Sequence, residues 1–251
     1  PTAEALMRTL DRPGLESVRA GIALQAYLPD SFAIQKRIIK WAERRVAQGG
    51  SPVTIRLVKG ANMEMERVHA AETGWPQAPF SSKSETDANF KRMLELGMEH
   101  LDAVRLGIAS HNLFDVTYGL ALAHERDALD YVQFEMLEGM ANHQRRALHD
   151  LTGQLLLYAP ACRREDFVFA IGYLIRRLDE NTGPENFLRH TFRLTPDSND
   201  WNRLRDGFLN SFKLISTLSS ASRRTQNRRL PPESPPSIGG DWHEFHNEPD
   251  T

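Results

Sequence analysis

Two basic residues mark the apolar segment Val53–Val58 and the turn that follows it. Arg56 lies inside this run, and Lys59 comes directly after it, next to Gly60. A guanidinium inside an apolar strand needs an anionic partner or a polar cavity, because an unpaired buried charge is costly. The pair Lys59-Gly60 is typical of an anion site at a strand end, since glycine lets the backbone approach a ligand closely.

Five short apolar runs are predicted to be strands, and each ends in polar or ionisable residues. The runs are Ile22–Leu28, Val53–Val58, Val104–Ala109, Tyr131–Met136 and Leu155–Tyr158. Their carboxyl ends carry Gln25 and Tyr27, Arg56 and Lys59, His111 and Asn112, Glu135 and Glu138, and Tyr158. In a parallel α/β barrel the reacting groups lie at this end of the strands, so we expect these side chains to share one site. For each of them, His111 above all, a purely structural role remains the alternative.

An arginine pair in the segment YLIRRLDEN allows two interpretations. Arg176 and Arg177 are adjacent, and Glu180 lies four and three residues further on, within side-chain reach of both on a helix. One interpretation is a solvated arginine face with a local ion pair. The other is a clamp of two guanidinium groups for a small carboxylate, a geometry that arginine serves better than lysine. Asp87 is assigned to a helix cap and not to the site.

Helical patterns alternate with the predicted strands. They cover Leu6–Leu10, Asp30–Gln48, Ser84–Leu96, Leu113–Glu125, Ala141–Leu151 and Arg164–Glu180. The third pattern begins with Ser84-Glu85-Thr86-Asp87, which is typical of a capping box. Strands that alternate with helices predict a parallel sheet with the helices outside it. The absence of a GxGxxG turn disfavours an open dinucleotide-binding sheet.

The rhythm of strands stops beyond Asn181. Two more helices are predicted, at Pro184–Phe192 and Trp201–Leu214. A basic cluster follows, which we expect to be a solvated face or tail, and then the stretch LPPESPPSIGG, which is typical of a linker. The cluster consists of Arg223, Arg224, Arg228 and Arg229.

Length, charge and cysteine content narrow the class of protein. A chain of 251 residues can bury a substantial core, and its net charge of -2 indicates neither nucleic acid nor an anionic membrane as a general partner. A single cysteine, no signal peptide and no apolar run of about 20 residues predict a soluble cytoplasmic protein. No Ser-His-Asp set is recognisable, and His111 has no second histidine at ligand spacing, so we expect no metal site.

Six segments together resemble the proline dehydrogenase barrel of the bifunctional proline utilization A flavoenzymes, in an actinobacterial-type branch. They are LQAY, RLVKGA, SHN, FEMLEGM, LLLYAP and YLIRRLDEN, in the order of the family, from about Gly14 to Asn181. The resemblance implies an α/β chain that is the C-terminal part, about five βα units, of a (β/α)8 TIM-like barrel. It also implies an FAD-dependent oxidation of L-proline to 1-pyrroline-5-carboxylate in proline catabolism.

On the flavin side, the resemblance implies roles for individual residues. Arg56 would face the reactive edge of the flavin, where negative charge develops on reduction. Lys59 and the backbone of Gly60 would approach the pyrophosphate. Two departures from the family pattern fall here: Asn62-Met63 stands where an aromatic pair is frequent, and Glu135 stands where the family has glutamine. The flavin-contacting positions would be Gln25, Arg56, Val58, Lys59, Gly60, Ala61, Ser110, His111, Asn112 and Glu135.

On the substrate side, the resemblance implies a second group of residues. Arg176 and Arg177 would hold the proline carboxylate, and Glu180 would support the two arginines. Tyr158 would pack on the substrate ring, with Leu137 nearby. The reaction expected of this arrangement is hydride transfer from the carbon next to the proline nitrogen.

The same resemblance implies a division of the chain. Residues 1–181 would form the partial barrel, 182–220 a helical extension, and 221–251 a linker toward an aldehyde dehydrogenase domain, whose lead-in the closing NEPDT resembles. NAD would serve only that adjoining domain. The first three barrel strands would precede Pro1, and the chain alone is expected to self-associate. Further expected partners of the parent are a quinone or other electron acceptor and, peripherally, the inner face of the membrane.

Two alternatives remain open at the level of sequence. One is a different barrel enzyme that binds a phosphorylated ligand, with Lys59-Gly60 as its anion site. The other is a non-enzymatic structural or oligomerisation segment of a larger protein. DNA binding has no support, because no DNA-binding module is recognisable in the sequence.

Overall fold

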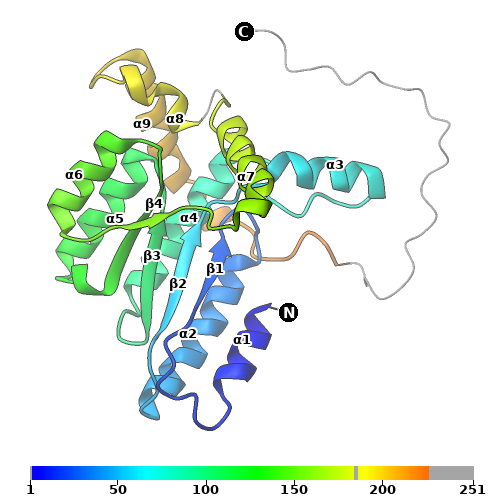
Figure 1. Cartoon of the computed structure of the whole chain (residues 1–251), viewed down its shortest axis with the longest axis vertical. Helices are drawn as coiled ribbons and strands as arrows, with labels where there is room; N and C mark the ends of the chain where they lie inside the picture. Colours follow the sequence, from blue (N-terminus) through cyan, green and yellow to red (C-terminus); the bar gives the residue numbers. More distant parts are fainter. Residues whose placement is uncertain (1, 184–185, 226–251) are drawn as a thin grey trace.

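The centre of the fold is a parallel sheet whose strand order, β1-β2-β3-β4-β5, follows the chain (Figure 1). The computed structural model describes residues 2–183 and 186–225. The five strands span Gly21–Gln25, Val53–Val58, Val104–Ala109, Val132–Leu137 and Leu156–Tyr158. Each neighbouring pair is parallel, and a helix lies between successive strands in the chain. This arrangement confirms the predicted α/β class and the partial TIM-like barrel.

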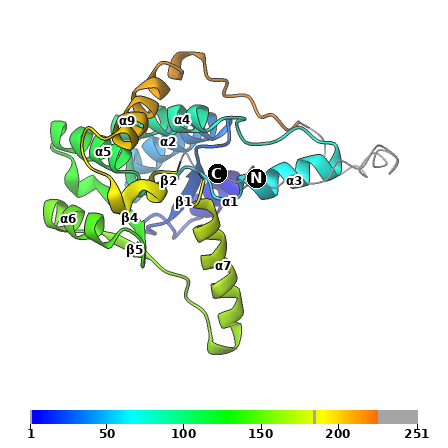
Figure 2. The same ribbon diagram turned by 90° about the horizontal axis from the view of Figure 1, so that it is seen from above.

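Helices precede, separate and follow the strands. α2, α4 and α5 lie on one side of the sheet, whereas α7 extends from the other side (Figure 2). The α-helices are α1 Thr2–Leu10, α2 Ser31–Ala47, α3 Met63–Thr73, α4 Lys83–Met98, α5 Leu113–Glu125, α6 Asn142–Thr152, α7 Phe167–Glu180, α8 Phe187–His190 and α9 Asn199–Phe212. Short 3-10 helices occur at η1 Leu129–Tyr131, η2 Arg164–Asp166, η3 Thr191–Arg193 and η4 Ile215–Thr217.

The alternation of side chains along β2 explains why an arginine interrupts an apolar strand. Val53, Ile55 and Leu57 are fully buried in the core that the sheet forms with α4. Because successive side chains of a strand point to opposite faces, Arg56 lies on the face of the sheet opposite to α4. In a (β/α) barrel that opposite face is the interior, where the reacting groups of such enzymes lie at the carboxyl ends of the strands.

The start of α4 differs from the prediction. The cap residue is Ser82, whose hydroxyl accepts the Glu85 backbone N–H, while the Glu85 carboxylate accepts the Ser82 N–H. The predicted box at Ser84–Asp87 is therefore wrong by two residues. As a consequence, Asp87 lies inside the first turns of the helix, where its side chain is nearly buried.

The basic cluster near the C-terminus is the solvated face that we predicted only in part, because Arg223 is exposed whereas Arg224 is packed against other residues. Arg223 donates to the carbonyl of Pro79, and Arg224 donates to the carbonyl of Pro76. The Arg224 guanidinium lies 5.7 Å from the Trp75 ring centroid, and only 7% of its side chain is exposed. These contacts dock Arg223 and Arg224 onto the loop between α3 and α4. Arg228, Arg229 and the predicted linker lie outside the described residues.

In the part of the chain that the structure describes, no helix combines the length and the apolar character needed to cross a membrane.

Candidate active site at the carboxyl ends of the strands

An ion pair crosses the open face of the sheet. Arg56 of β2 donates through Nε to the carboxylate of Glu135 on β4. The Glu135 side chain is 3% exposed and that of Arg56 is 31% exposed. Gly107 on β3 lies between the two strands, and a Cβ at this position would lie 3.3 Å from Arg56 Cα and overlap the Glu135 carboxylate. The ion pair therefore depends on a glycine in the intervening strand.

A chain of aromatic and cationic contacts leads from this ion pair to α7 and back. The Arg56 guanidinium lies 5.3 Å from the ring centroid of Tyr158, which lies 6.1 Å from that of Tyr173. Arg177 lies 5.0 Å from the Tyr173 ring and donates through Nη2 to the Ala61 carbonyl, at 3.0 Å. Because Ala61 follows β2, these five residues form a closed circuit that joins α7 to the strand ends (Figure 1).

Lys59 is the centre of a row of alternating charges. Its Nζ lies 2.5 Å from Asp87 and 2.5 Å from Asp115, Lys83 lies 2.5 Å from Asp87, and Lys91 lies 3.8 Å from Asp115. Burial disfavours the charged form of Lys59, but the carboxylates of Asp115 and Asp87 more than offset this effect and raise its pKa. Lys59 is therefore cationic at the end of β2.

Two neighbours of Lys59, Asp87 and Lys91, both have a lowered pKa, but for different reasons. Burial opposes the charged form of Asp87, yet the adjacent cations Lys59 and Lys83 lower its pKa below the ordinary value. Lys91, which is 1% exposed, has its pKa lowered to about 8 by burial, although Asp115 partly offsets the effect. The Lys91 ammonium makes no hydrogen bond within the described part of the chain and lies 4.1 Å from the Phe208 ring centroid on α9.

Hydrogen bonds order the segment after β3. The Ser110 hydroxyl donates to Asp115 at 3.3 Å and accepts the Asn112 backbone N–H at 3.1 Å. The Asn112 side chain in turn caps α5, because its Oδ1 accepts the Phe114 N–H at 3.0 Å. Ser110 and Asn112 thus connect the strand end to Asp115 and, through it, to Lys59.

His111 is held in one tautomer and retains a free donor. Its Nε2 accepts the backbone N–H of Leu137 at 3.0 Å, so the proton of the neutral ring resides on Nδ1. Burial lowers the pKa of His111, which keeps the ring neutral. Nδ1 is buried and has no hydrogen-bond partner among residues 2–183 and 186–225. A ligand at the strand ends could accept this hydrogen.

The ends of β1 and β2 are joined around Gly60. The N–H of Tyr27 donates to the Lys59 carbonyl at 2.7 Å, and Gln25 pairs in register with Val58. Gly60 has a φ of +132°, and a Cβ on it would overlap the Tyr27 ring. This corner thus requires glycine for both conformation and packing.

Most of the predicted site residues fall into two groups. Lys59, Ser110, His111 and Asn112 lie at the ends of β2 and β3, where Lys59 and Ser110 contact Asp115. Arg56, Tyr158, Arg177 and Ala61 belong to the circuit, and Glu135 pairs with Arg56. Gln25, Val58 and Gly60 lie where β1 and β2 are joined. Leu137, at the end of β4, bonds to His111 through its backbone. Arg176 is exposed on α7 and lies outside the circuit. Glu180 ends α7, but its side chain lies outside what the structure describes.

Three residues of the site were missed in the sequence. The assignment of Asp87 to the helix cap is wrong, because its carboxylate pairs with Lys59 and does not cap α4. Asp115 in the first turn of α5 completes the lysine site. Tyr173 precedes Arg177 by four residues, a spacing that places both on one helix face and could have indicated the contact.

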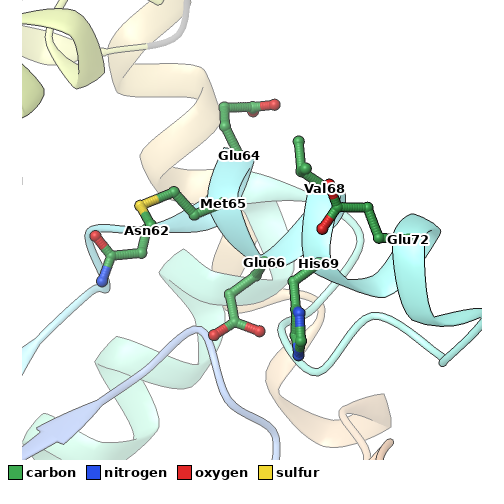
Figure 3. A pocket seen from close by; sticks show the side chains of 7 residues that line it. All are labelled: Asn62, Glu64, Met65, Glu66, Val68, His69 and Glu72. Atoms are coloured by element: carbon green, nitrogen blue, oxygen red, sulfur yellow. The ribbon is translucent and has the colours of Figure 1, made fainter.

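A surface pocket of about 610 Å³ lies along α3. Figure 3 shows its side chains, which come from the helix and from Asn62 just before it. The lining residues are Asn62, Glu64, Met65, Glu66, Val68, His69 and Glu72. Because Met65 and Val68 are 62% and 41% exposed, the pocket is open surface, and it contains none of the predicted site residues.

Comparisons with known proteins agree with this geometry. The family model for proline dehydrogenase matches residues 1–190. The chain is similar to the structure of Proline Utilization A (PutA) from Corynebacterium freiburgense, with 39% identity and a TM-score of 0.77 over 90% of this chain and 22% of that chain. It is also similar to PutA from Bdellovibrio bacteriovorus inactivated by N-propargylglycine, with 28% identity and a TM-score of 0.73 over the same shares.

A PutA mutant from Bradyrhizobium japonicum shares the fold, with 23% identity and a TM-score of 0.70 over 87% of this chain and 22% of that chain. No curated protein matches the chain. The chain spans about a fifth of the length of these solved relatives, 22% in each case. Since the family model covers well over half of the sequence, the chain belongs to the proline dehydrogenase family.

Proposed function

We propose that this chain is the C-terminal part of an FAD-dependent proline dehydrogenase barrel within a longer protein of the proline utilization A type. The family match and the 39% identical structure support the assignment, and the 22% coverage of that structure supports a longer parent. In the complete barrel, L-proline would be oxidised to 1-pyrroline-5-carboxylate. Residues 1–181 would belong to the barrel, 182–220 to a helical extension and 221–251 to a linker.

The observation that carries this proposal is the circuit from Arg56 through Tyr158, Tyr173 and Arg177 to Ala61. It gathers two cations and two aromatic rings at the strand ends. Proline combines a carboxylate with a compact apolar ring, and its recognition needs a cation and a flat apolar surface. Arg177 and Tyr158 offer these two features, and both contact Tyr173.

The residues at the strand ends fit a bound FAD, which would supply the two-electron acceptor. Lys59 is cationic and is held at the end of β2 by two carboxylates. His111 Nδ1 is a buried donor without a partner in the described part of the chain. We assign the flavin contacts to Gln25, Arg56, Val58, Lys59, Gly60, Ala61, Ser110, His111 and Asn112, with Glu135 behind Arg56.

The substrate residues would orient proline and exclude alternative poses. Oxidation removes a hydride from the carbon next to nitrogen and a proton from the nitrogen, which leaves a carbon–nitrogen double bond. Arg177, with Arg176, would bind the carboxylate, supported by Glu180. Tyr158 and Leu137 would pack against the ring and fix the reacting carbon. Arg56 would stabilise the negative charge that develops on the acceptor side.

The same assignment suggests an adjoining domain, an electron acceptor and a cellular location for the parent protein. We propose an adjoining aldehyde dehydrogenase domain that uses NAD, and a quinone or a similar acceptor for the electrons. The resemblance of NEPDT to the lead-in of such a domain supports the first point. A cytoplasmic location with peripheral contact at the inner membrane face would bring the protein to a quinone.

Expression of the full-length product of this reading frame tests the proposal. The purified protein should contain FAD and should reduce an artificial dye with L-proline while a cyclic imine accumulates. A matched preparation of Arg177→Met should retain the flavin and lose dye reduction at low proline. A full-length protein that lacks flavin, or that contains flavin and does not oxidise proline, contradicts the proposal.

A further inference from the structure

Glu135 is a buried carboxylate at a position where the family pattern has glutamine. Its side chain is 3% exposed, and its Oε2 accepts from Nε of Arg56. A buried carboxylate requires a cationic partner, because removal of one member of such a pair leaves an uncompensated charge. The ion pair therefore ties Glu135 to the residue that we assign to the flavin edge.

The strand register shows that this ion pair joins β2 to β4 across the intervening strand β3. Arg56 of β2 is aligned with Gly107 of β3, which is aligned with Gln133 of β4. Glu135 lies two residues beyond Gln133 and so shares its face of the sheet. The two partners must reach across β3, and only a residue without a side chain at position 107 leaves the space.

The pairing uses one edge of the guanidinium and leaves the other two nitrogens available. Arg56 is bonded through Nε, and the Tyr158 ring lies 5.3 Å from its central carbon. Nη1 and Nη2 make no hydrogen bond to any residue that the structure describes. Glu135 thus fixes the guanidinium from behind, and the two Nη groups remain for a ligand.

We propose that Glu135 is a positioning residue that holds Arg56 through Nε, directs its Nη groups to the flavin and lowers the reduction potential of the site, with Gly107 providing the space. The inference rests on the proposed function, since it concerns the flavin edge that Arg56 faces. A carboxylate near the acceptor opposes the added negative charge of reduction, whereas an unpaired arginine favours it. A neutral residue at position 135 should therefore make the flavin easier to reduce.

The test is the flavin midpoint potential of the full-length product, measured under anaerobic conditions. We expect Glu135→Gln to change the ratio of reduced to oxidised flavin at least tenfold, which is a positive shift of about 30 mV for a two-electron couple. Arg56→Met should shift the potential in the negative direction. In the Arg56→Met background, the effect of Glu135→Gln on the potential should differ from its effect alone, because the two residues are coupled.

Glu125→Gln is the matched control, since it makes the same chemical change at a residue that is not part of the candidate site. Glu125 is the exposed last residue of α5, so we expect the parent potential. A flavin-loaded Glu135→Gln protein with the parent potential overturns the inference and leaves the proposed function intact. A parent protein without flavin overturns both.

If Glu135→Gln does not fold, Glu135→Asp provides the second test. Aspartate keeps the charge but is shorter by one methylene, so it should misplace Arg56 and shift the potential in the same negative direction as Arg56→Met. We expect flavin reduction by proline to slow at least tenfold while flavin content is unchanged. An unchanged rate of reduction in a flavin-loaded Glu135→Asp protein overturns the positioning role.

Discussion

Arg177 on α7 donates a hydrogen bond to the backbone carbonyl of Ala61, at 3.0 Å and across 116 residues of sequence. This bond joins the helix that carries the arginine pair to the segment that follows β2. Tyr173, four residues before Arg177, adds the contact to Tyr158 of β5. The helix that we assign to the substrate carboxylate is thus attached directly to the strand end that we assign to the flavin.

Arg177→Met should raise the KM for proline in the full-length protein and leave its flavin content nearly unchanged. The variant loses a charge-assisted hydrogen bond to the substrate carboxylate, worth about 1.5–3 kcal/mol. That loss corresponds to an increase in KM of about tenfold or more. Arg146→Met, on the exposed face of α6, is the control and should have parent kinetics. Unaltered proline kinetics in Arg177→Met would remove Arg177 from the site.

Asp87→Asn should destabilise the chain at neutral pH. The substitution weakens a buried carboxylate–lysine contact, at a cost of about 1.5–3 kcal/mol in the free energy of unfolding. Because neighbouring lysines lower the pKa of Asp87, its contribution is present above the ordinary pKa of about 4 and is lost as the pH falls further. The difference in the free energy of unfolding between Asp87→Asn and the parent, measured by urea unfolding, should therefore narrow in acid. Asp150→Asn, whose side chain is 82% exposed, should match the parent; equal stability of Asp87→Asn and the parent at pH 7 would refute the prediction.

Lys91→Met should change the pH dependence of stability in the alkaline range. Burial lowers the pKa of Lys91 to about 8, below its ordinary value of about 10.4. Between these values the unfolded chain binds more protons, so the stability of the parent rises with pH. The stability of Lys91→Met relative to the parent should thus be greater at pH 7 than at pH 10, by about 3 kcal/mol. Lys36→Met removes an exposed lysine near the Phe32 ring, and its stability relative to the parent should not change with pH. If the stability of Lys91→Met relative to the parent is the same at pH 7 and pH 10, the prediction is contradicted.

The 251-residue chain alone should self-associate and be colourless. In the described part of the chain, β1 and β5 are the outer strands of the sheet, and each has one edge without a neighbour. Phe167, Val168 and Phe169 on α7 are 60%, 65% and 73% exposed. Unpaired edges and apolar faces recruit other chains.

Light scattering with a matched pair of variants checks this prediction. Phe169→Glu on α7 should reduce the association. Phe192→Glu should not, although Phe192 is 89% exposed, because it lies in η3 and not on the apolar face of α7. A monomeric chain that carries flavin would be the contrary result.

The fold is predictable from sequence where one local signal dominates. Val53–Val58 and Val104–Ala109 are strands at the predicted bounds, because each is an apolar run with clear polar ends. β1 ends at Gln25 and not at Leu28, because the Leu28 N–H turns back to the Gln25 carbonyl. The docking of Arg224 on Trp75 joins segments about 150 residues apart, and no local pattern indicates it.

The candidate site is less predictable, because its charges are paired across the fold. The ionisable residues at the strand ends were found from their positions alone, but the partners of Lys59 were not. Asp87 lies 28 residues from Lys59 and had a sufficient local explanation in the helix cap. The Arg56–Glu135 pair spans 79 residues and depends on a glycine in a third strand, which only the register reveals.

The most direct test is an anaerobic titration of the full-length protein with L-proline, followed by the visible absorbance of its flavin. We predict that L-proline bleaches the flavin band and that the cyclic imine forms in equal amount to the reduced flavin. In Arg177→Met, the same bleaching should require a proline concentration about tenfold higher or more. A flavin-loaded protein whose absorbance does not change with L-proline would contradict the assignment of proline oxidation to this site.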